Sequence, residues 1–513
     1  LEGLAKKLFA PLAITVITGM LAGYVVSMLV TPTACRFLLG HHGEPPAFAK
    51  KMDAFVRRVA KGYSDVLARV LHHRLAVIVA AAVLVASAVL GASRLPTTFF
   101  PELDESMARV YVRLAPGTSV EEAGQKLREM GKVLHDELPP GSVKLVLTNS
   151  GTPGKARAAM NSPNAGPHMG FIRLELPEPE HRKLSQREIT DEMRAILARH
   201  YPGVDVLEAP GGLVASVFND GYLAPIVLEI EGNDLGELRE ASLDVVSVAR
   251  DVAGLRDPYA MLETEYPELR FTQDRTIAGL VGVSSRDLAQ TTLEATLGNV
   301  NTPGVWVDAS NGQSYFVVTF YDDKVVTDRE SLAATPIKTT SKGGAIEIGT
   351  YSTIERSTGP IAIERNHLSR VATVLFQTER RDVGSVAADL EERLRRDPRT
   401  KKLNVRFVGQ VALMRTTFSG LGVAIGLAIM VVFMILVTQF KSLRLPFVML
   451  FTVPVALVGV VLALMAAGLG LSITSLMGVL MVVGIGMSNG ILLVDHANPV
   501  SYTHLTLPTS DLV

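Results

Sequence analysis

The sequence predicts an α+β membrane protein, in which a transmembrane helix bundle carries a large α+β region outside the cytoplasm. Three observations indicate this class. The 513-residue chain is 48% hydrophobic, which is high for a soluble protein. Its longest apolar blocks lie near the two ends. Between them, 322 residues (96–417) alternate between strand and helix patterns. This length also predicts more than one domain.

The composition excludes several classes of function. A formal net charge of −1 gives no global reason to expect a nucleic acid partner. Cys35 is the only cysteine, so an internal disulfide is excluded. The string "SGTPGKA" lacks P-loop spacing, and no zinc-protease or nucleophile-elbow motif occurs. We therefore expect no enzyme activity, no cofactor and no metal site. The chain begins at Leu1 without a signal-peptide pattern, so we expect a fragment.

The apolar blocks predict five membrane spans. They cover residues 8–30, 75–91, 421–438 and 445–494. The last block has no Asp, Glu, Lys or Arg over 50 residues. As a helix it would be about 75 Å long, more than twice the ~30 Å hydrocarbon core. It must therefore cross twice, and the small and polar residues 467–475 predict the turn.

Basic residues predict the orientation. Residues 31–74 carry eight Lys and Arg against three acids, which places them in the cytoplasm. Within them, "FAKKMDAFVRRVAKGYSDVLARVL" has helical apolar spacing and predicts an amphipathic helix along the inner leaflet. Counting spans from this segment places residues 96–417 outside the cytoplasm.

The external region predicts two related units. The first contains the strands "MARVYVRL", "VKLVLT", "GFIRLEL" and "VDVL". Its two helices begin with the capping boxes Ser119/Glu122 and Ser185/Glu188. This β-α-β-β-α-β order is that of a split βαβ (ferredoxin-like) sandwich. A second copy follows but is interrupted. It opens with the strand "APIVLEIEG" and a helix (235–252), and it ends with the strand "RVATVLFQ", a helix (383–395) and the strand "LNVRFVG". Between them lies a β-rich insert whose hairpin turns at Asn311 and Gly312.

These patterns predict eight segments along the chain. They are a span (1–40), a cytoplasmic amphipathic helix (41–74), a second span (75–95), the first external unit (96–221), the second unit (222–272 and 360–412), its insert (273–359), three further spans (418–498) and a tail (499–513).

Four strings, taken together and in this order, resemble a known family. They are "VTPTACRFLL", "LPTTFFPELDES", "TQFKSLRLPFVMLFTVPVALVGVVLAL" and "GIGMSNGILLVDHAN". Over residues 1 to about 498 the chain resembles the resistance-nodulation-division (RND) efflux permeases, proton-driven trimeric pumps of bacterial inner membranes. The resemblance implies that the five spans are the sixth to tenth of twelve. It also implies that the external units are porter subdomains with a docking insert. The chain would then be a C-terminal-half fragment that does not transport alone.

The resemblance implies a function and partners. A complete permease would export small molecules from the periplasm or inner membrane through a tripartite channel, driven by protons. Its partners would be two further copies, a periplasmic adaptor protein and an outer-membrane channel. Three alternatives stay open: a heavy-metal or lipid-exporting branch, a relative that assists protein secretion, and a membrane scaffold or binding protein that does not transport.

The resemblance places Ser488 and Asn489 near the proton relay. Many relatives carry Lys and Asn here, facing intramembrane carboxylates, so Ser488 stands where the cation would be. The pair would hydrogen-bond those carboxylates or their waters, or would only support helix packing. Asp495 lies seven residues beyond Ser488, on nearly the same helix face. It would serve a proton exit path or mark the cytoplasmic helix end.

Substrate-pocket candidates lie in residues 149–171, where drug-pumping relatives place a Phe-rich pocket. Phe171 is the one aromatic residue in this segment, so aromatic stacking has little support. Met160, His168 and Met169 offer soft-metal ligands, although their spacing is irregular. These four residues are the predicted candidates.

The last fifteen residues, "PVSYTHLTLPTSDLV", depart from the family pattern because they contain no Lys or Arg. They resemble the translated sequencing-adapter peptides found at the ends of environmental gene fragments. We expect a non-native tail here, the alternative being an unusual polar loop.

Overall fold

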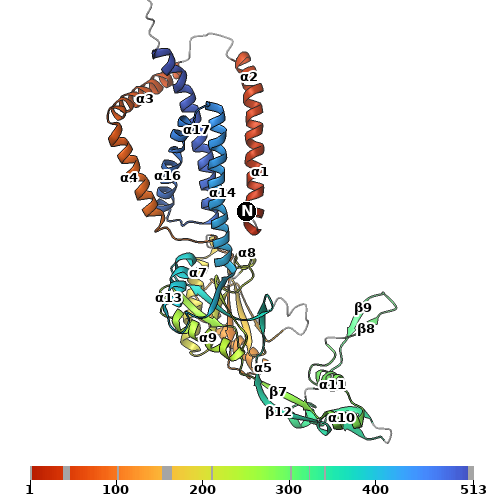
Figure 1. Cartoon of the computed structure of the whole chain (residues 1–513). Coiled ribbons are helices and arrows are strands. Elements are labelled where there is room, and N and C mark those ends of the chain that lie inside the picture. Colours follow the sequence, from red (N-terminus) through yellow and green to blue (C-terminus); the bar gives the residue numbers. More distant parts are fainter. Residues whose placement is uncertain are drawn as a thin grey trace, which may run out of the picture. The chain divides into compact units, whose positions relative to one another are not determined.

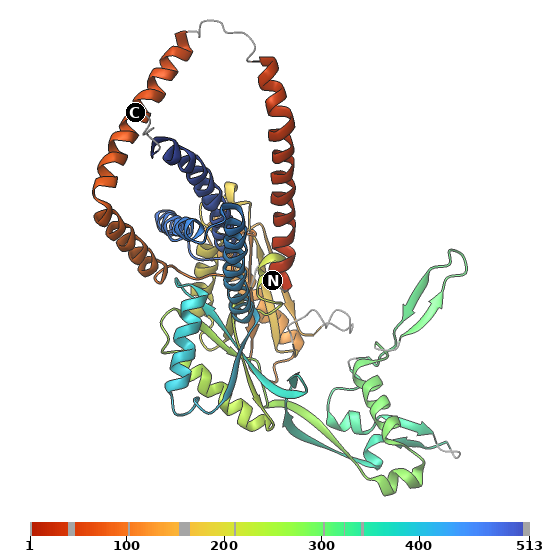
Figure 2. The ribbon, with the colours of Figure 1, turned by 45° about the horizontal axis from the view of Figure 1, so that its top comes forward.

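The computed structural model describes residues 3–38, 47–100, 103–152, 165–209, 212–300, 303–322, 324–339 and 343–505. Within these ranges the chain forms two compact units (Figures 1 and 2). Unit 1 takes Leu1–Pro101, Arg381–Ser385 and Val411–Val513, and unit 2 takes Glu102–Arg380 and Val386–Gln410. Each apolar block of the sequence belongs to unit 1, and the strands of both predicted external units belong to unit 2.

Unit 1 is helical. Its elements are α1 (Gly3–Val25), the π-helix η1 (Val26–Val30), α2 (Thr31–Leu38), α3 (Ala47–His72), α4 (Arg74–Ala92), α14 (Gly409–Phe440), α15 (Arg444–Leu450), α16 (Thr452–Ala466) and α17 (Ile473–Leu505). The first two residues of α14 belong to unit 2, and the helix belongs to unit 1 from Val411 onward. In the described part, four helical stretches are long and apolar enough to cross a membrane: Ala10–Leu38, Leu75–Ala92, Gly409–Phe440 and Arg444–Ala466. A shorter apolar helix covers Ile473–Ser488. The predicted turn falls between α16 and α17, where Gly468 has a φ of 65°.

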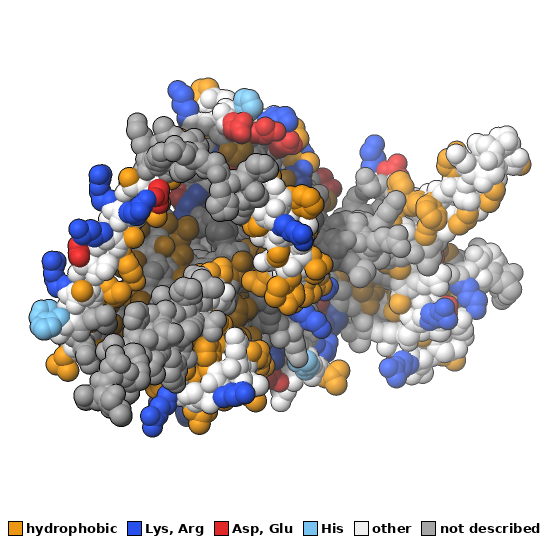
Figure 3. Space-filling view, turned by 90° about the horizontal axis from the view of Figure 1, so that it is seen from above, with side chains coloured by type: hydrophobic (Ala, Val, Ile, Leu, Met, Phe, Trp, Pro, Cys, Tyr) orange, Lys and Arg blue, Asp and Glu red, His pale blue; other side chains and the backbone are white. Residues whose placement is uncertain are grey.

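Helix α3 has the amphipathic pattern that the sequence predicts. Met52, Phe55 and Val59 follow one another at helical spacing, and Arg57 forms an i, i+4 ion pair with Asp53. All of these residues are exposed. Figure 3 views the chain from above, and Lys and Arg side chains stand out there among apolar ones. The apolar and basic residues along α3 suit a helix at a lipid headgroup layer.

A junction of three chain segments forms around Thr97 in unit 1. The backbone amide of Thr97 donates to the Asp382 carboxylate over 3.0 Å, and the Thr97 carbonyl accepts from the Gly384 amide over 3.1 Å. On its other side, the Pro96 carbonyl accepts from the Leu471 amide over 2.7 Å. The segment after α4 is thereby fixed both to the α16–α17 turn and to the first residues of α13 (Val383–Arg396).

The first sheet of unit 2 has the strand order β2-β3-β1-β4, with every pairing antiparallel. Helices α5 and α7 pack on it, and Leu127, Met130, Ile172 and Met193 are buried between the layers. Ser119 and Ser185 cap these helices as predicted, and Ser185 forms the full box with Glu188. The bounds are β1 (Met107–Arg113), α5 (Val120–Glu137), β2 (Leu145–Ser150), β3 (Met169–Glu175), α7 (Gln186–His200) and β4 (Asp205–Ala209).

The second sheet repeats this order. Strand β14 pairs with β5 on one edge and with β6 and β13 on the other, and β15 pairs with β5. The path β15-β5-β14-β6 therefore matches β4-β1-β3-β2. Its bounds are β5 (Ile226–Gly232), α9 (Leu235–Ala249), β6 (Leu255–Ala260), β13 (Glu364–Asn366), β14 (Ser369–Thr378), α13 and β15 (Asn404–Val408).

The insert is mixed α/β, so the β-rich prediction was wrong in part. Asp274 and Ser284 accept hydrogen bonds from the first turns of α10 and α11 and start these helices. The predicted hairpin is present as β8 and β9, with Gly312 at a φ of 70°. The bounds are β7 (Tyr266–Gln273), α10 (Arg275–Val281), α11 (Ser285–Leu297), β8 (Gly304–Val307), β9 (Ser314–Val317), α12 (Arg329–Ala333), β10 (Pro336–Thr339), β11 (Ala345–Glu347) and β12 (Ser352–Gly359).

Candidate substrate pocket and intramembrane polar site

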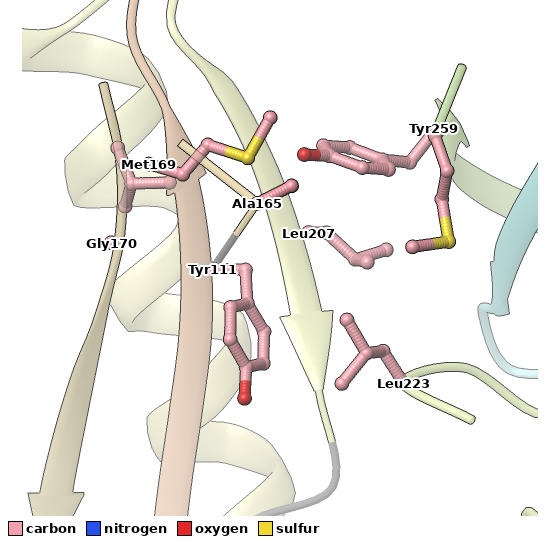
Figure 4. Close-up of a pocket in the computed structure, with 9 residues that line it drawn as sticks. Tyr111, Ala165, Met169, Gly170, Leu207, Leu223 and Tyr259 are labelled. Carbon is pink, nitrogen blue, oxygen red and sulfur yellow. The ribbon is translucent and has the colours of Figure 1, made fainter. Parts of the chain in front are cut away.

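A pocket lies between the two sheets of unit 2 (Figure 4). Its lining comes from both sheets and is apolar and aromatic: Tyr111, Val112, Ala165, Met169, Gly170, Leu207, Leu223, Tyr259 and Met261. The cavity measures about 30 Å³, which is enough for about two water molecules. Ligand pockets for drug-sized molecules have roughly 300–1,000 Å³. The pocket is therefore too small for such a ligand in this conformation, and it would have to widen to admit one.

Side chains from each sheet reach across to the other sheet beside the pocket. Strands β4 and β6 are edge strands of separate sheets, and they lie next to each other. The Gln377 side-chain amide donates to the Glu208 carbonyl over 2.7 Å, and Arg113 Nη1 donates to the Ala260 carbonyl over 2.8 Å. Each of these side chains satisfies a backbone carbonyl on the opposite edge. Closure of the pocket thus depends on side-chain contacts.

Arg113 lies beside the pocket, where its guanidinium contacts the lining residue Tyr259. Its Nη2 lies 2.7 Å from an Asp205 carboxylate oxygen, and its guanidinium lies 4.2 Å from the centroid of the Tyr259 ring. Burial alone would lower the pKa of Arg113, but its electrostatic interactions with Tyr259 and Asp205 and a hydrogen bond to Asp205 raise the pKa above its ordinary value. Burial also raises the pKa of the Tyr259 hydroxyl. A fixed cation therefore stands beside a neutral aromatic wall.

His168 is buried away from the lining. Its Nε2 lies 3.0 Å from Glu263 Oε2, and its ring packs on Tyr266 with centroids 5.1 Å apart. Its exposed fraction is 0%. Burial raises the pKa of Tyr266, and the Glu263 charge adds to that effect. The predicted candidate His168 thus connects the two sheets within unit 2 and is not among the residues that line the pocket.

The other sequence candidates have different outcomes. Met169 lines the pocket, where the structure brings it together with Met261. Phe171 packs against Tyr111 with ring centroids 5.7 Å apart, and the Arg109 guanidinium lies 5.7 Å from the Phe171 ring. Phe171 supports the pocket wall without being part of its lining. Met160 lies outside the described residues.

The sequence reasoning missed most of the lining, including Tyr111, Tyr259 and Met261. A signal for Tyr111 was present, because period-2 alternation in "MARVYVR" places it opposite the core residues Val110 and Val112. No comparable signal marks Tyr259. Its strand, "LRDPYA", contains charged residues and a proline, which disfavour a strand assignment.

The intramembrane candidates lie on α17. Ser488 is exposed, whereas the side chains of Asn489 and Asp495 lie outside the described residues. Two nearby glycines face α16, because a Cβ at Gly486 or Gly490 would lie 3.8 Å from its nearest neighbour on that helix. Small residues at these positions allow close packing of α17 and α16. Among the residues that the structure describes, no group of three or more His, Cys, Asp or Glu could hold a metal ion.

Apolar helices together with a two-sheet α+β region define a membrane protein of the RND permease fold. The chain belongs to the AcrB/AcrD/AcrF family, whose model matches residues 1–506. Membership in this family of RND efflux permeases confirms the resemblance noted in the sequence.

Several curated relatives are similar over nearly the whole chain. The cobalt-zinc-cadmium resistance protein CzcA of Cupriavidus metallidurans is 24% identical over 506 residues, which cover 96% of this chain and 46% of that protein. The multidrug resistance protein MdtC of Proteus mirabilis is 24% identical over 510 residues, which cover 97% of this chain and 46% of that protein. The chain spans about half the length of the curated relatives it matches.

A crystal structure of a heavy metal efflux pump has a similar fold. Its TM-score is 0.71 at 23% sequence identity, and the match covers 87% of this chain and 45% of that one. A second crystal form gives the same TM-score at 22% identity. These likenesses establish the fold of the chain.

Proposed function

We propose that this chain is part of a proton-driven RND permease that exports small molecules, and that the pocket between the two sheets binds them. The observation that carries the proposal is the closed apolar and aromatic pocket, lined from both sheets and shut by side-chain contacts. A pocket of this kind can open and close without breaking either sheet. Export requires such alternation, because the substrate must enter from one side and leave toward another. The protein acts as a transporter and not as an enzyme.

The proposed organisation has five spans, two porter subdomains and a docking insert. The repeated strand orders β4-β1-β3-β2 and β15-β5-β14-β6 support two split βαβ units. Four long apolar helical stretches and the shorter apolar helix Ile473–Ser488 support the five spans. The insert on the ladder of β7 and β12 supports a separate docking subdomain.

The proposed location is the bacterial inner membrane, with residues 96–417 in the periplasm. Support comes from the basic residues of the 31–74 segment, which mark a cytoplasmic side. The amphipathic helix α3 belongs to this segment and would lie along the inner leaflet.

The proposed assembly is a homotrimer that works with a periplasmic adaptor and an outer-membrane channel. The hairpin of β8 and β9 supports contacts between copies, because its apolar side chains are exposed on both faces. Trp306 is 55% exposed and Phe316 is 69% exposed. A two-stranded ribbon with two apolar faces is stable only when other protein covers it.

Proton coupling would involve the polar pair of α17 and, toward its end, Asp495. Ser488 is exposed on a helix whose neighbouring glycines pack on α16, so another helix could approach the Ser488 face. A polar residue in an apolar span is costly unless it faces a polar partner. The pair would therefore hydrogen-bond intramembrane carboxylates or their waters.

Export of soft metal ions is a second candidate function. Met169 and Met261 bring two thioethers to one pocket, and thioether sulfur selects soft cations. One similar protein is named for cobalt, zinc and cadmium resistance. The two candidates differ in the side chains they need, aromatic rings for organic molecules and methionine sulfur for metal ions.

An efflux assay distinguishes the two candidates. The complete reading frame that contains this chain is expressed in a bacterium lacking its own pumps, and ethidium efflux and Ag⁺ tolerance are measured. We expect ethidium efflux that a protonophore abolishes. We also expect Tyr111→Ala with Tyr259→Ala to slow it several-fold and Met169→Leu with Met261→Leu to leave it unchanged. Loss of Ag⁺ tolerance in the methionine variant alone would favour metal export, and absence of export of either probe would contradict both.

A further inference from the structure

The contact between the two sheets is antiparallel but has no backbone ladder among the described residues. Asp205 at the start of β4 lies near Ala260 at the end of β6, because Arg113 binds both. Glu208 lies near Arg256 toward the opposite ends of the same strands. The two edges thus run side by side in opposite directions, yet each belongs to a different sheet. We call this contact between β4 and β6 the seam.

Crossed ion pairs close one end of the seam. Arg256 of β6 contacts Asp191 of α7, with Nη1 and Oδ1 2.7 Å apart, and it also pairs with Glu208 of β4. In the opposite sense, Arg194 of α7 donates through Nε to Asp257 of β6 over 2.8 Å. Each sheet unit therefore contributes both a cation and an anion. Such a crossed arrangement fixes the relative position of the two edges in both directions along the seam.

These charges are shielded from water on the β6 side. The side chains of Arg256 and Asp257 are 7% and 6% exposed. Burial raises the pKa of Glu208, and Asp257 and Asp191 add to this effect, while Arg256 opposes it. Removing the Arg256 guanidinium would leave Asp191 and Glu208 without the cation that joins them, next to the third carboxylate, Asp257. The cluster would then repel itself and favour separation of the two edges.

Asp257 has an irregular backbone conformation at this end of the seam. Its φ of 50° lies in the left-handed region, which Asp adopts more readily than most residues other than glycine. The pairing of β6 with β14 shifts register at the same place, between Leu375 and Gln377. Arg194 contacts the Asp257 side chain from across the seam.

We propose that Arg256 is a positioning residue that keeps the seam closed, so that loss of its ion pairs with Asp191 and Glu208 opens the pocket. This inference deepens the proposed function and rests on it for its meaning in transport. The ion pairs themselves can be broken and re-formed without any change in the hydrogen bonding within either sheet. Arg256 thus controls ligand access to the pocket without lining it.

Thiol labelling tests this role in the full chain. Leu207 lines the pocket and is 0% exposed, and Cys35 is the only native cysteine and is exposed. In a Cys35→Ser, Leu207→Cys protein in detergent, the rate of reaction with N-ethylmaleimide reports opening of the pocket. We expect Arg256→Met to raise this rate about tenfold or more. Arg256→Lys, which keeps one charge without the two-pronged geometry, should give an intermediate rate.

Two controls separate opening from unfolding. Ala123→Cys places the thiol in the core beneath the first sheet of unit 2, at 0% exposure, where α5 packs on that sheet. We expect its labelling to stay slow in the Arg256→Met protein. Arg406→Met removes an arginine that pairs with Glu229 over 2.8 Å within the second sheet, and it should leave labelling of Leu207→Cys unchanged.

The proposal is overturned if Arg256→Met labels Leu207→Cys at the unmodified rate. It is also overturned if Ala123→Cys labels faster by the same factor, since Arg256 would then only hold the fold together. The labelling needs no transport, so it can succeed where the efflux assay fails. If the complete protein exports ethidium but Arg256→Met does not change the labelling of Leu207→Cys, the proposed function stands and Arg256 has no role in closing the seam.

Discussion

His168 and Glu263 join the two sheet units through one buried contact, with Nε2 and Oε2 3.0 Å apart across 95 residues of sequence. His168 precedes β3 of the first sheet, and Glu263 follows β6 of the second. The other ring nitrogen of His168 and the other carboxylate oxygen of Glu263 are buried without a hydrogen-bond partner. The hydrogen bond between Nε2 and Oε2 therefore has to offset the cost of burying both polar side chains.

Replacing His168 by Ala should destabilise unit 2. Glu263 would be left with a buried carboxyl group and no partner, which costs about 1–3 kcal/mol. The measurement is the thermal unfolding midpoint in detergent. His181→Ala is the matched control, because the His181 side chain is 72% exposed, and its midpoint should not change. Equal midpoints for the two variants would show that the His168–Glu263 contact contributes nothing.

Asp382 should make the junction at Thr97 sensitive to acid. Burial alone would raise the pKa of Asp382, but hydrogen bonds from Ser385 and Thr97 outweigh it and hold the pKa below its ordinary value of 3.8. A depressed carboxyl pKa gives stability that is present above pH 3.8 and is lost as the pH falls through the folded-state value.

Asp382→Asn tests this dependence. The unmodified protein should unfold at a higher temperature than the variant at pH 6, and the difference should shrink as the pH falls below 3.8. Asp136→Asn, at an exposed residue of α5, serves as the control and should match the unmodified protein at every pH. If the difference in unfolding temperature between the Asp382→Asn and unmodified proteins stayed constant with pH, ionisation of Asp382 would not contribute to the stability of the junction.

Gly470→Val should damage the same junction from its other side. A Cβ at Gly470 would lie 2.3 Å from the Pro96 carbonyl oxygen, so the two backbones would have to separate. Overpacking of this kind costs about 1–3 kcal/mol. Gly459→Ala, in α16 with nothing within 4 Å of its added Cβ, is the control and should be neutral or slightly stabilising. Comparable unfolding midpoints for the two variants would argue against a close approach at Pro96.

The hairpin of β8 and β9 should be needed for assembly. Trp306 is the only tryptophan in the chain, so its emission should shift to shorter wavelength when copies assemble and cover it. We expect Val305→Asp with Phe316→Asp to reduce the mass measured by light scattering to that of one copy. Leu280→Asp, at a residue 83% exposed on α10, should not change the mass. An unchanged mass in the hairpin variant would assign assembly to another surface.

Much of the fold could be predicted because local rules govern it. The helix starts at Ser119 and Ser185 follow capping chemistry, and the hairpin at Gly312 follows turn chemistry. Strand β6 escaped prediction because its edge position and its ion pairs compensate for residues that a central strand would exclude. The helices of the insert escaped prediction although Asp274 and Ser284 carried capping signals.

The pocket was harder to predict, since it forms between residues far apart in the chain. Met169 was identified from a segment next to its strand, whereas Tyr259 and Met261 reach the pocket only through the pairing of β6 with β14. His168 shows the opposite case. Its residue type suggested a ligand, but the fold gives it a buried partner, Glu263. Single-residue chemistry cannot distinguish these roles without the topology that brings the partners together.

The central claim is proton-driven export through the pocket between the two sheets. The most direct measurement reconstitutes the product of the complete reading frame in liposomes, imposes a pH gradient and follows ethidium transport. We predict transport only in the presence of the gradient, and a several-fold lower rate for the Tyr111→Ala, Tyr259→Ala variant. The claim would be contradicted if the rate of transport were the same with and without the gradient and in the Tyr111→Ala, Tyr259→Ala variant. It would also be contradicted if transport did not exceed that of empty liposomes.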